Sequence, residues 1–174
     1  MNNDARVPEF HLTQFDFTTL EEELQVDQHC RSLLQCFHAW LLQGGLTPEQ
    51  ASERAYCVDY YLRDYLMDTL CWNILRVRPR LVRCFGGTWY IIRTMEPEFR
   101  LLEQHLNAIL AWYRYLQESS LITMDEYLLV EAECSDREWY RRRVDSFLDL
   151  KADQYDAWER GCSLRSLVEE VKHV

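Results

Sequence analysis

The sequence predicts an all-α protein, and two observations carry that prediction. The 174 residues include only five glycines and four prolines, too few for the frequent turns of a β-sandwich or β-barrel. Apolar residues recur at spacings of three and four in several segments, which is the period of a helix with one buried face. We therefore expect helices joined by short loops.

An arm and a first helix are expected at the start of the chain. Residues 1–17 show no sustained helical period, so we expect an arm that is ordered only where it packs on the rest of the protein. Thr18 and Glu21 form a capping-box pattern that predicts the start of a helix. Gly44 and Gly45 should end that helix.

A second helix is predicted to follow directly. Thr47 is a suitable N-cap, and Pro48 then occupies the first helical position, where its missing N–H is not needed. Val58 and Leu62 belong to a repeat at spacings of three and four. This helix should run to about Leu70.

A third helix is predicted to start at Pro79, and its end is ambiguous in the sequence. Gly86 and Gly87 should break it, because glycine disfavours a helix interior. The aromatic and β-branched residues at 89–92 fit either a strand or another turn of helix.

The most regular pattern in the chain follows Pro97 and predicts a long helix with one buried face. Its apolar positions are separated by 3, 4, 3, 4 and 3 residues. They are Phe99, Leu102, Leu106, Ile109, Tyr113 and Leu116.

Two more capping boxes predict further helices. Thr123 with Glu126 should start one of them. Ser135 with Glu138 should start a longer one, which Gly161 is expected to stop.

The expected elements divide the chain into three parts. Ser163 is suited to cap a short terminal helix. We expect an arm over residues 1–17, a helical domain over 18–122 and a C-terminal helical extension over 123–174.

Charge is distributed unevenly, although the formal net charge is −10. Residues 1–71 carry 4 arginines and 12 acids, and residues 118–174 carry 8 basic and 14 acidic side chains. Between them, residues 72–117 carry 7 arginines and only 3 glutamates. This basic stretch is the candidate for contact with a negatively charged partner.

Enzyme and metal signatures are absent from the sequence. It contains no phosphate-loop, dinucleotide-binding, nucleophile-elbow or zinc-protease motif. His29, Cys30, Cys36 and His38 cluster in sequence, but ligands on one helix need spacings of three or four to converge. We therefore expect no catalytic residues, no metal site and no cofactor.

The seven cysteines are irregularly spaced and form no C-x-x-C pair. They are typical of reduced, mostly buried thiols. Because no signal segment opens the chain and no apolar run is long enough to span a bilayer, we expect a cytoplasmic protein without membrane contact. The cysteines are Cys30, Cys36, Cys57, Cys71, Cys84, Cys134 and Cys162.

The arginines of the basic stretch allow two interpretations. Their guanidinium groups suit phosphate oxygens, but they also suit salt bridges to the acidic flanks of the same chain. A second basic run at 141–143 lies among acids, and its side chains should fan out over a solvated helix surface. The arginines of the basic stretch are Arg76, Arg78, Arg80, Arg83, Arg93, Arg100 and Arg114.

Three motifs between about residues 33 and 123 resemble the N-terminal, SAM-like core-binding domain of tyrosine recombinases and phage integrases. They are Phe-His-Ala-Trp-Leu at 37–41 leading into Gly-Leu-Thr-Pro at 45–48, the tyrosine- and leucine-marked segment 56–66, and Leu-Asn-Ala-Ile-Leu-Ala-Trp-Tyr-Arg-Tyr-Leu at 106–116. The resemblance implies an orthogonal bundle of about four helices that clamps duplex DNA. It also implies that His105 or Asn107 faces a DNA groove.

The sequence departs from that family in two respects. The family's catalytic domain should follow, but too few residues remain for it, and no histidine has arginine three residues on. We therefore expect no recombinase activity from this chain alone. The second helix, which should approach DNA, also carries five acids: Glu49, Glu53, Asp59, Asp64 and Asp68.

Three functions remain open from the sequence. The first is a non-catalytic DNA-binding module that contacts phosphates through the basic stretch. The second is a protein-interaction or regulatory module that binds a basic partner or another copy of itself. The third, ranked last, is a helical enzyme whose site has no recognisable motif.

Overall fold

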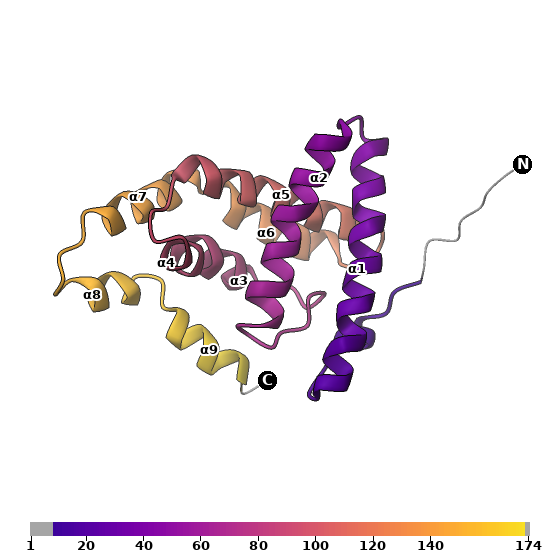
Figure 1. Ribbon diagram of the computed structural model, residues 1–174, viewed down its shortest axis with the longest axis horizontal. Coiled ribbons are helices and arrows are strands. Elements are labelled where there is room, and N and C mark those ends of the chain that lie inside the picture. The colour runs from indigo at the N-terminus through magenta and orange to yellow at the C-terminus, as the bar shows by residue number, and fades with distance from the viewer. Residues whose placement is uncertain (1–8, 173–174) are drawn as a thin grey trace, which may run out of the picture.

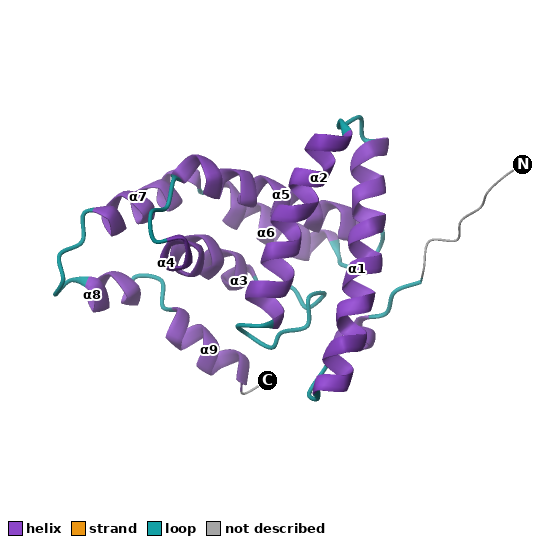
Figure 2. Cartoon of the chain, in the orientation of Figure 1, coloured by secondary structure: helices purple, strands orange, loops and turns teal. Residues whose placement is uncertain are grey.

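The computed structural model describes residues 9–172, and over that range the chain forms helices and connecting turns without any strand (Figure 2). The all-α prediction is confirmed. The first eight residues of the predicted arm lie outside the described range. The α-helices are α1 (Leu20–Gln43), α2 (Pro48–Tyr60), α3 (Pro79–Cys84), α4 (Tyr90–Thr94), α5 (Phe99–Glu118), α6 (Met124–Ser135), α7 (Arg137–Leu148), α8 (Tyr155–Arg160) and α9 (Leu164–Lys172).

The helices pack as a bundle in which the helix axes run in two main directions. Figure 1 shows α1 and α2 side by side, with α5 and α6 running across them and α7 lying further to the left. α2 packs against both α1 and α5, and α5 packs in turn against α6. Helices from the C-terminal part of the sequence pack against its middle part, because α6 and α9 both contact α3.

The core lies where these helices cross, and its large polar side chains have partners. Tyr61 and Tyr113 are buried, and their hydroxyl groups are 3.1 Å apart. The Tyr65 hydroxyl donates to the carbonyl of Leu81 at 2.8 Å. These hydrogen bonds offset the cost of burying phenol groups and connect the second helix to α3 and α5.

The described part of the arm is ordered by packing. Leu12–Phe15 forms one 3-10 turn, and the Phe15 side chain is fully buried. The Asn73 amide nitrogen donates to the Leu12 carbonyl and to the Asp16 carboxylate, both at 2.8 Å.

The starts of α1 and α2 follow helix-capping chemistry. α1 is capped by Thr19 with Glu22, one residue later than the predicted pair. Glu22 still accepts from the Thr18 backbone, so both threonines contribute to the cap. Thr47 caps α2 as predicted, and the chain continues past Tyr60 as a π-helical turn to Met67.

The predicted break at Gly86 and Gly87 is wrong. The chain is helical from Pro79 to Thr94, with a π-helical turn at Phe85–Trp89, so residues 89–92 are helix and not strand. A Cβ at Gly86 would lie 2.8 Å from the Tyr140 ring, and one at Gly87 would lie 2.4 Å from the Trp139 ring. The glycines therefore allow α7 to approach closely, and this packing outweighs their low helix propensity.

The predicted long helix ending at Gly161 is also wrong. Asp136 takes the place of the expected Ser135 cap, and the chain leaves the helical conformation at 149–154. α8 then folds back on α7, where the Trp158 indole N–H donates to the Ser146 hydroxyl at 3.1 Å. The last predicted cap is confirmed, because Ser163 Oγ accepts from the Ser166 N–H ahead of α9.

Gly87→Ala should lower the free energy of unfolding by about 1–2 kcal/mol, because overpacking a core costs about 1–3 kcal/mol and exceeds the gain in helix propensity. Urea denaturation measures this change. Gly44→Ala is the control, because a Cβ there meets nothing closer than 3.4 Å, and we expect a change within about 0.5 kcal/mol. Equal stability of the Gly87→Ala variant and the wild type would contradict the close approach of α7.

Candidate functional site

Three arginines of the basic stretch form ion pairs with the acidic flanks. Arg76 pairs with Asp16 at 3.1 Å, and Arg80 pairs with Glu170. Arg83 pairs with two acids, Asp136 at 2.9 Å and Glu133 at 3.2 Å. The salt-bridge interpretation of these three side chains is confirmed.

The other arginines of that stretch have different surroundings. Arg78 lies over the Trp72 ring at 4.6 Å, and Arg93 lies over the Trp89 ring at 5.5 Å. Arg114 pairs with Glu118, one turn along α5, at 3.0 Å. Arg100 is exposed, and no ion pair is recorded for it among residues 9–172. The seven side chains therefore face different elements of the fold.

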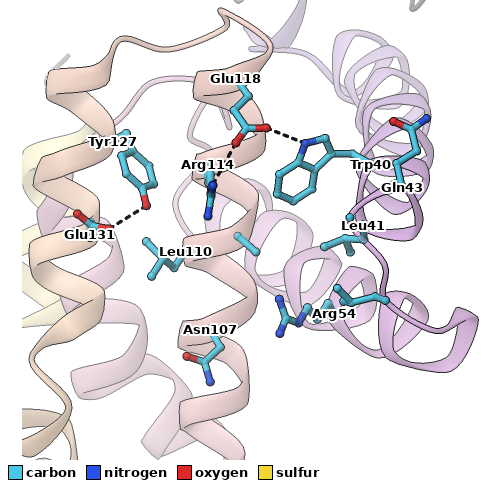
Figure 3. A pocket seen from close by; sticks show the side chains of 13 residues that line it. Trp40, Leu41, Gln43, Arg54, Asn107, Leu110, Arg114, Glu118, Tyr127 and Glu131 are labelled. Carbon is cyan, nitrogen blue, oxygen red and sulfur yellow. Dashed lines mark hydrogen bonds and ion pairs between the residues drawn. The ribbon is translucent and has the colours of Figure 1, made fainter.

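The structure places Asn107 and Arg114 on the same side of α5 and His105 on another side of that helix. Asn107 and Arg114 line a hollow of about 870 Å³ between the α1–α2 hairpin and α6 (Figure 3). His105 and Asn107 line a second hollow of about 910 Å³ between α2, α4 and α5.

These two hollows are adjacent, because Leu46, Arg54 and Asn107 line both of them. We call the two together the α5 groove. Apart from the three shared residues, its lining at the first hollow includes Trp40, Gln43, Leu110, Ala111, Arg114, Glu118, Tyr127 and Glu131. At the second hollow it includes Gln50, Glu53, Tyr56, Cys57, Tyr90, Leu101, Gln104 and His105.

Helical spacing explains which side of α5 faces the groove. Leu106, Ile109 and Tyr113 are buried in the core. Asn107 and Arg114 lie two turns apart on the exposed side, with Leu110 and Ala111 half-buried between them. The first hollow therefore has an apolar patch on α5 between two polar side chains.

Hydrogen bonds hold the upper wall of the groove in place. Figure 3 shows the Glu118 carboxylate between Trp40 and Arg114. It accepts from the Trp40 indole N–H at 2.9 Å and from Arg114 Nε at 3.0 Å. Across the groove, the Tyr127 hydroxyl donates to Glu131 at 2.9 Å. Both aromatic rings therefore have fixed orientations.

The lining of the α5 groove has more acidic than basic side chains, because Arg54, which both hollows share, and Arg114 stand against three glutamates. The first hollow contains Arg54 and Arg114 with Glu118 and Glu131. The second contains Arg54 and Glu53. No ion pair is recorded for Arg54 within the described chain, which leaves its guanidinium available to a ligand.

His105 sits among aromatic rings at the edge of the second hollow. Its ring lies 4.9 Å from that of Tyr90 and 5.5 Å from that of Tyr60. Burial lowers the pKa of His105, and it raises the pKa of the neighbouring Cys57 thiol. Both groups are therefore neutral near pH 7, which is opposite to an activated cysteine–histidine pair.

The histidines and cysteines that cluster in sequence along α1 do not converge on a metal site. Within residues 9–172, no group of three His, Cys, Asp or Glu side chains is arranged to hold a metal ion. Burial raises the pKa of Cys30 to about 12, so its thiol stays protonated.

Within residues 9–172, no helix has the length and apolar character needed to cross a membrane.

Sequence reasoning missed the residues that the α5 groove takes from other helices. Arg54 on α2, Trp40 on α1 and Tyr127 on α6 all line it. Trp40 and Tyr127 are half-buried aromatic residues outside the predicted core positions. Large aromatic residues outside the buried helix face are a sign of a second contact surface. The sequence does not show which helices form that surface.

Comparisons with known proteins identify no relative. No protein-family model, no curated protein and no solved structure matches the chain. The resemblance to recombinase core-binding domains therefore stays a prediction.

Arg83→Gln should lower the free energy of unfolding by about 1–2 kcal/mol, because a half-buried guanidinium with two carboxylate partners is lost. Arg83 also lies 3.6 Å from the centre of the Trp139 ring. Arg100→Gln is the matched control and should change stability by less than about 0.5 kcal/mol. If urea denaturation gives the same free energy of unfolding for both variants, the contacts of Arg83 do not stabilise the fold.

Proposed function

We propose that this protein is a non-catalytic protein-binding module that holds a peptide segment of its partner in the α5 groove. The observation that carries the proposal is the groove itself: two adjacent hollows with aromatic walls, apolar patches and a lining without excess positive charge. Exposed apolar surface bordered by polar groups is typical of protein interfaces.

Aromatic and arginine side chains supply the contacts that such an interface needs. Trp40, Tyr56 and Tyr127 line the groove from three different helices. Tyr56 is 70% exposed, so much of its ring is free to contact a ligand. Arg54 lies where the two hollows meet. Tryptophan, tyrosine and arginine dominate the binding energy of most protein interfaces.

Electrostatics favour a protein partner over nucleic acid at this groove. A surface that grips a phosphate backbone is positively charged, whereas the groove lining has two arginines against three glutamates and the whole chain carries −10. The pKa directions of Cys57 and His105 also favour binding over nucleophilic catalysis.

A peptide library displayed on phage tests the proposal. We expect wild-type protein to enrich a consensus peptide, and Ala111→Trp should weaken binding of that peptide at least about tenfold because the new ring fills the groove. Ala132→Trp is the matched control, because Ala132 is an exposed helical alanine outside the groove lining. It should bind as the wild type does.

Circular dichroism establishes whether both tryptophan variants are folded. Failure to enrich any peptide, or equal loss of binding in the two folded variants, would overturn the proposal.

DNA binding is a second candidate, and the clustering of predicted residues on α5 favours it. Asn107 and Arg114 lie on the same side of α5, and Arg54 faces them without a recorded carboxylate partner in the described chain. The resemblance to recombinase core-binding domains supports the same function.

Fluorescence anisotropy of a labelled duplex of about 30 base pairs tests this second candidate at low and physiological salt. Binding through phosphates should weaken steeply with salt, and Arg54→Glu/Arg114→Glu should abolish it. Arg141→Glu/Arg142→Glu, at exposed positions on α7, controls for the change in net charge. The absence of binding at low salt would exclude DNA as the partner.

A further inference from the structure

Two buried cysteine thiols face each other far from the α5 groove. The Sγ atoms of Cys84 and Cys162 are 3.6 Å apart. Cys84 ends α3, and Cys162 lies in the turn between α8 and α9. Among the seven cysteines, this is the one sulfur–sulfur contact recorded within residues 9–172. The function proposed above makes no use of it.

Hydrogen bonds that do not involve the sulfur atoms hold the two backbones together. The Thr88 hydroxyl donates to the Cys162 carbonyl at 2.6 Å. Arg143 donates to the Gly87 carbonyl at 2.9 Å, to the Trp158 carbonyl at 2.7 Å and to Thr88 Oγ1 at 3.2 Å. The two thiols are therefore kept adjacent by groups on three other segments.

The charges around the pair make the two sulfur atoms unequal. The hydrogen bond between the two thiols lowers the pKa of Cys162 to about 7 against the opposing effect of burial, with Arg143 and Arg83 also contributing. The same hydrogen bond raises the pKa of Cys84.

The buried carboxylate of Glu159 accepts hydrogen bonds from the Ser163 hydroxyl and the Arg165 N–H. No carboxylate within 4.0 Å of the Arg143 guanidinium is recorded in the described chain, so its charge remains available to stabilise a thiolate. Cys162 is therefore the nucleophile of the pair, and Cys84 is the second thiol.

We propose that Cys84 and Cys162 form an oxidisable dithiol site that reacts with hydrogen peroxide to give an intramolecular disulfide. The Cys162 thiolate attacks the peroxide oxygen, the O–O bond breaks, and a sulfenic acid and one water molecule form after proton uptake. The Cys84 sulfur then attacks the Cys162 sulfur and displaces the hydroxyl group as a second water molecule. In total, two thiols are oxidised and one peroxide is reduced to two water molecules.

The fold allows the two sulfur atoms to close to bonding distance. A disulfide needs them about 2 Å apart, so the pair must approach by about 1.6 Å from the 3.6 Å separation. Cys162 lies outside both neighbouring helices. The turn that carries it can therefore shift without breaking helical hydrogen bonds. The product would covalently tie α3 to the C-terminal helices.

Peptide mapping after peroxide treatment tests the site. Folded protein carrying Cys71→Ser, which removes the exposed cysteine, is treated with hydrogen peroxide, alkylated and digested without reduction. We expect a linked peptide pair containing Cys84 and Cys162, lighter by two hydrogen atoms than the two free peptides together. The other four cysteines should be recovered alkylated once the protein is unfolded.

Cys84→Ala in the same background should lose the linked peptide, and Cys162 should instead appear as sulfinic or sulfonic acid. Cys134→Ala is the matched control, because Cys134 is a fully buried thiol with no recorded sulfur neighbour in residues 9–172. It should form the same Cys84–Cys162 link. Recovery of Cys84 and Cys162 as free thiols, or linkage of either to a different cysteine, would overturn the proposal.

A melting experiment supports the mapping without relying on a cysteine variant at the site. Oxidised Cys71→Ser protein should melt about 5 °C or more above its reduced form, because the crosslink constrains a long loop in the unfolded chain. A lower melting temperature after oxidation would contradict a disulfide that fits this fold.

Discussion

The close approach of α7 to Gly86 and Gly87 is the constraint on which the C-terminal third of the fold depends. Because neither position has a Cβ, the rings of Tyr140 and Trp139 can lie directly against the helix backbone. One turn later, Arg143 reaches backbone carbonyls at both Gly87 and Trp158. This contact sets the position of α8 and of the turn that follows it. The same geometry places the two facing thiols next to each other.

Charge in this chain serves mainly to hold its segments together. The basic stretch and the acidic flanks look in sequence like separate surfaces, but Arg76, Arg80 and Arg83 each pair with an acid from a flank. Such ion pairs consume the positive charge that a nucleic-acid interface needs. What remains open is the α5 groove, with Arg54 where its two hollows meet. The proposed peptide-binding function follows from this division between paired and available side chains.

Local patterns predicted the helices well, and long-range packing explains the errors. The pattern from Phe99 to Leu116 gave α5 and its buried face, because a 3–4 spacing needs no knowledge of the partner helix. Gly86 and Gly87 were predicted to break a helix. Instead they let α7, more than 50 residues later in the sequence, pack against the helix backbone. Of the residues that line the groove, the sequence singled out only His105, Asn107 and Arg114 as candidate DNA contacts. Arg54 and Tyr127 join the groove through helix packing that periodicity does not encode.

Backbone-amide NMR of isotope-labelled protein, titrated with a peptide selected on the wild type, tests the central claim most directly. The account predicts that the shifted amides cluster along the α5 groove, at residues 40–57, 104–118 and 127–131. It also predicts that amides of the basic stretch at 76–83 stay unchanged, because those arginines are engaged within the fold. Shifts concentrated at 76–83, with the groove unaffected, would contradict the account.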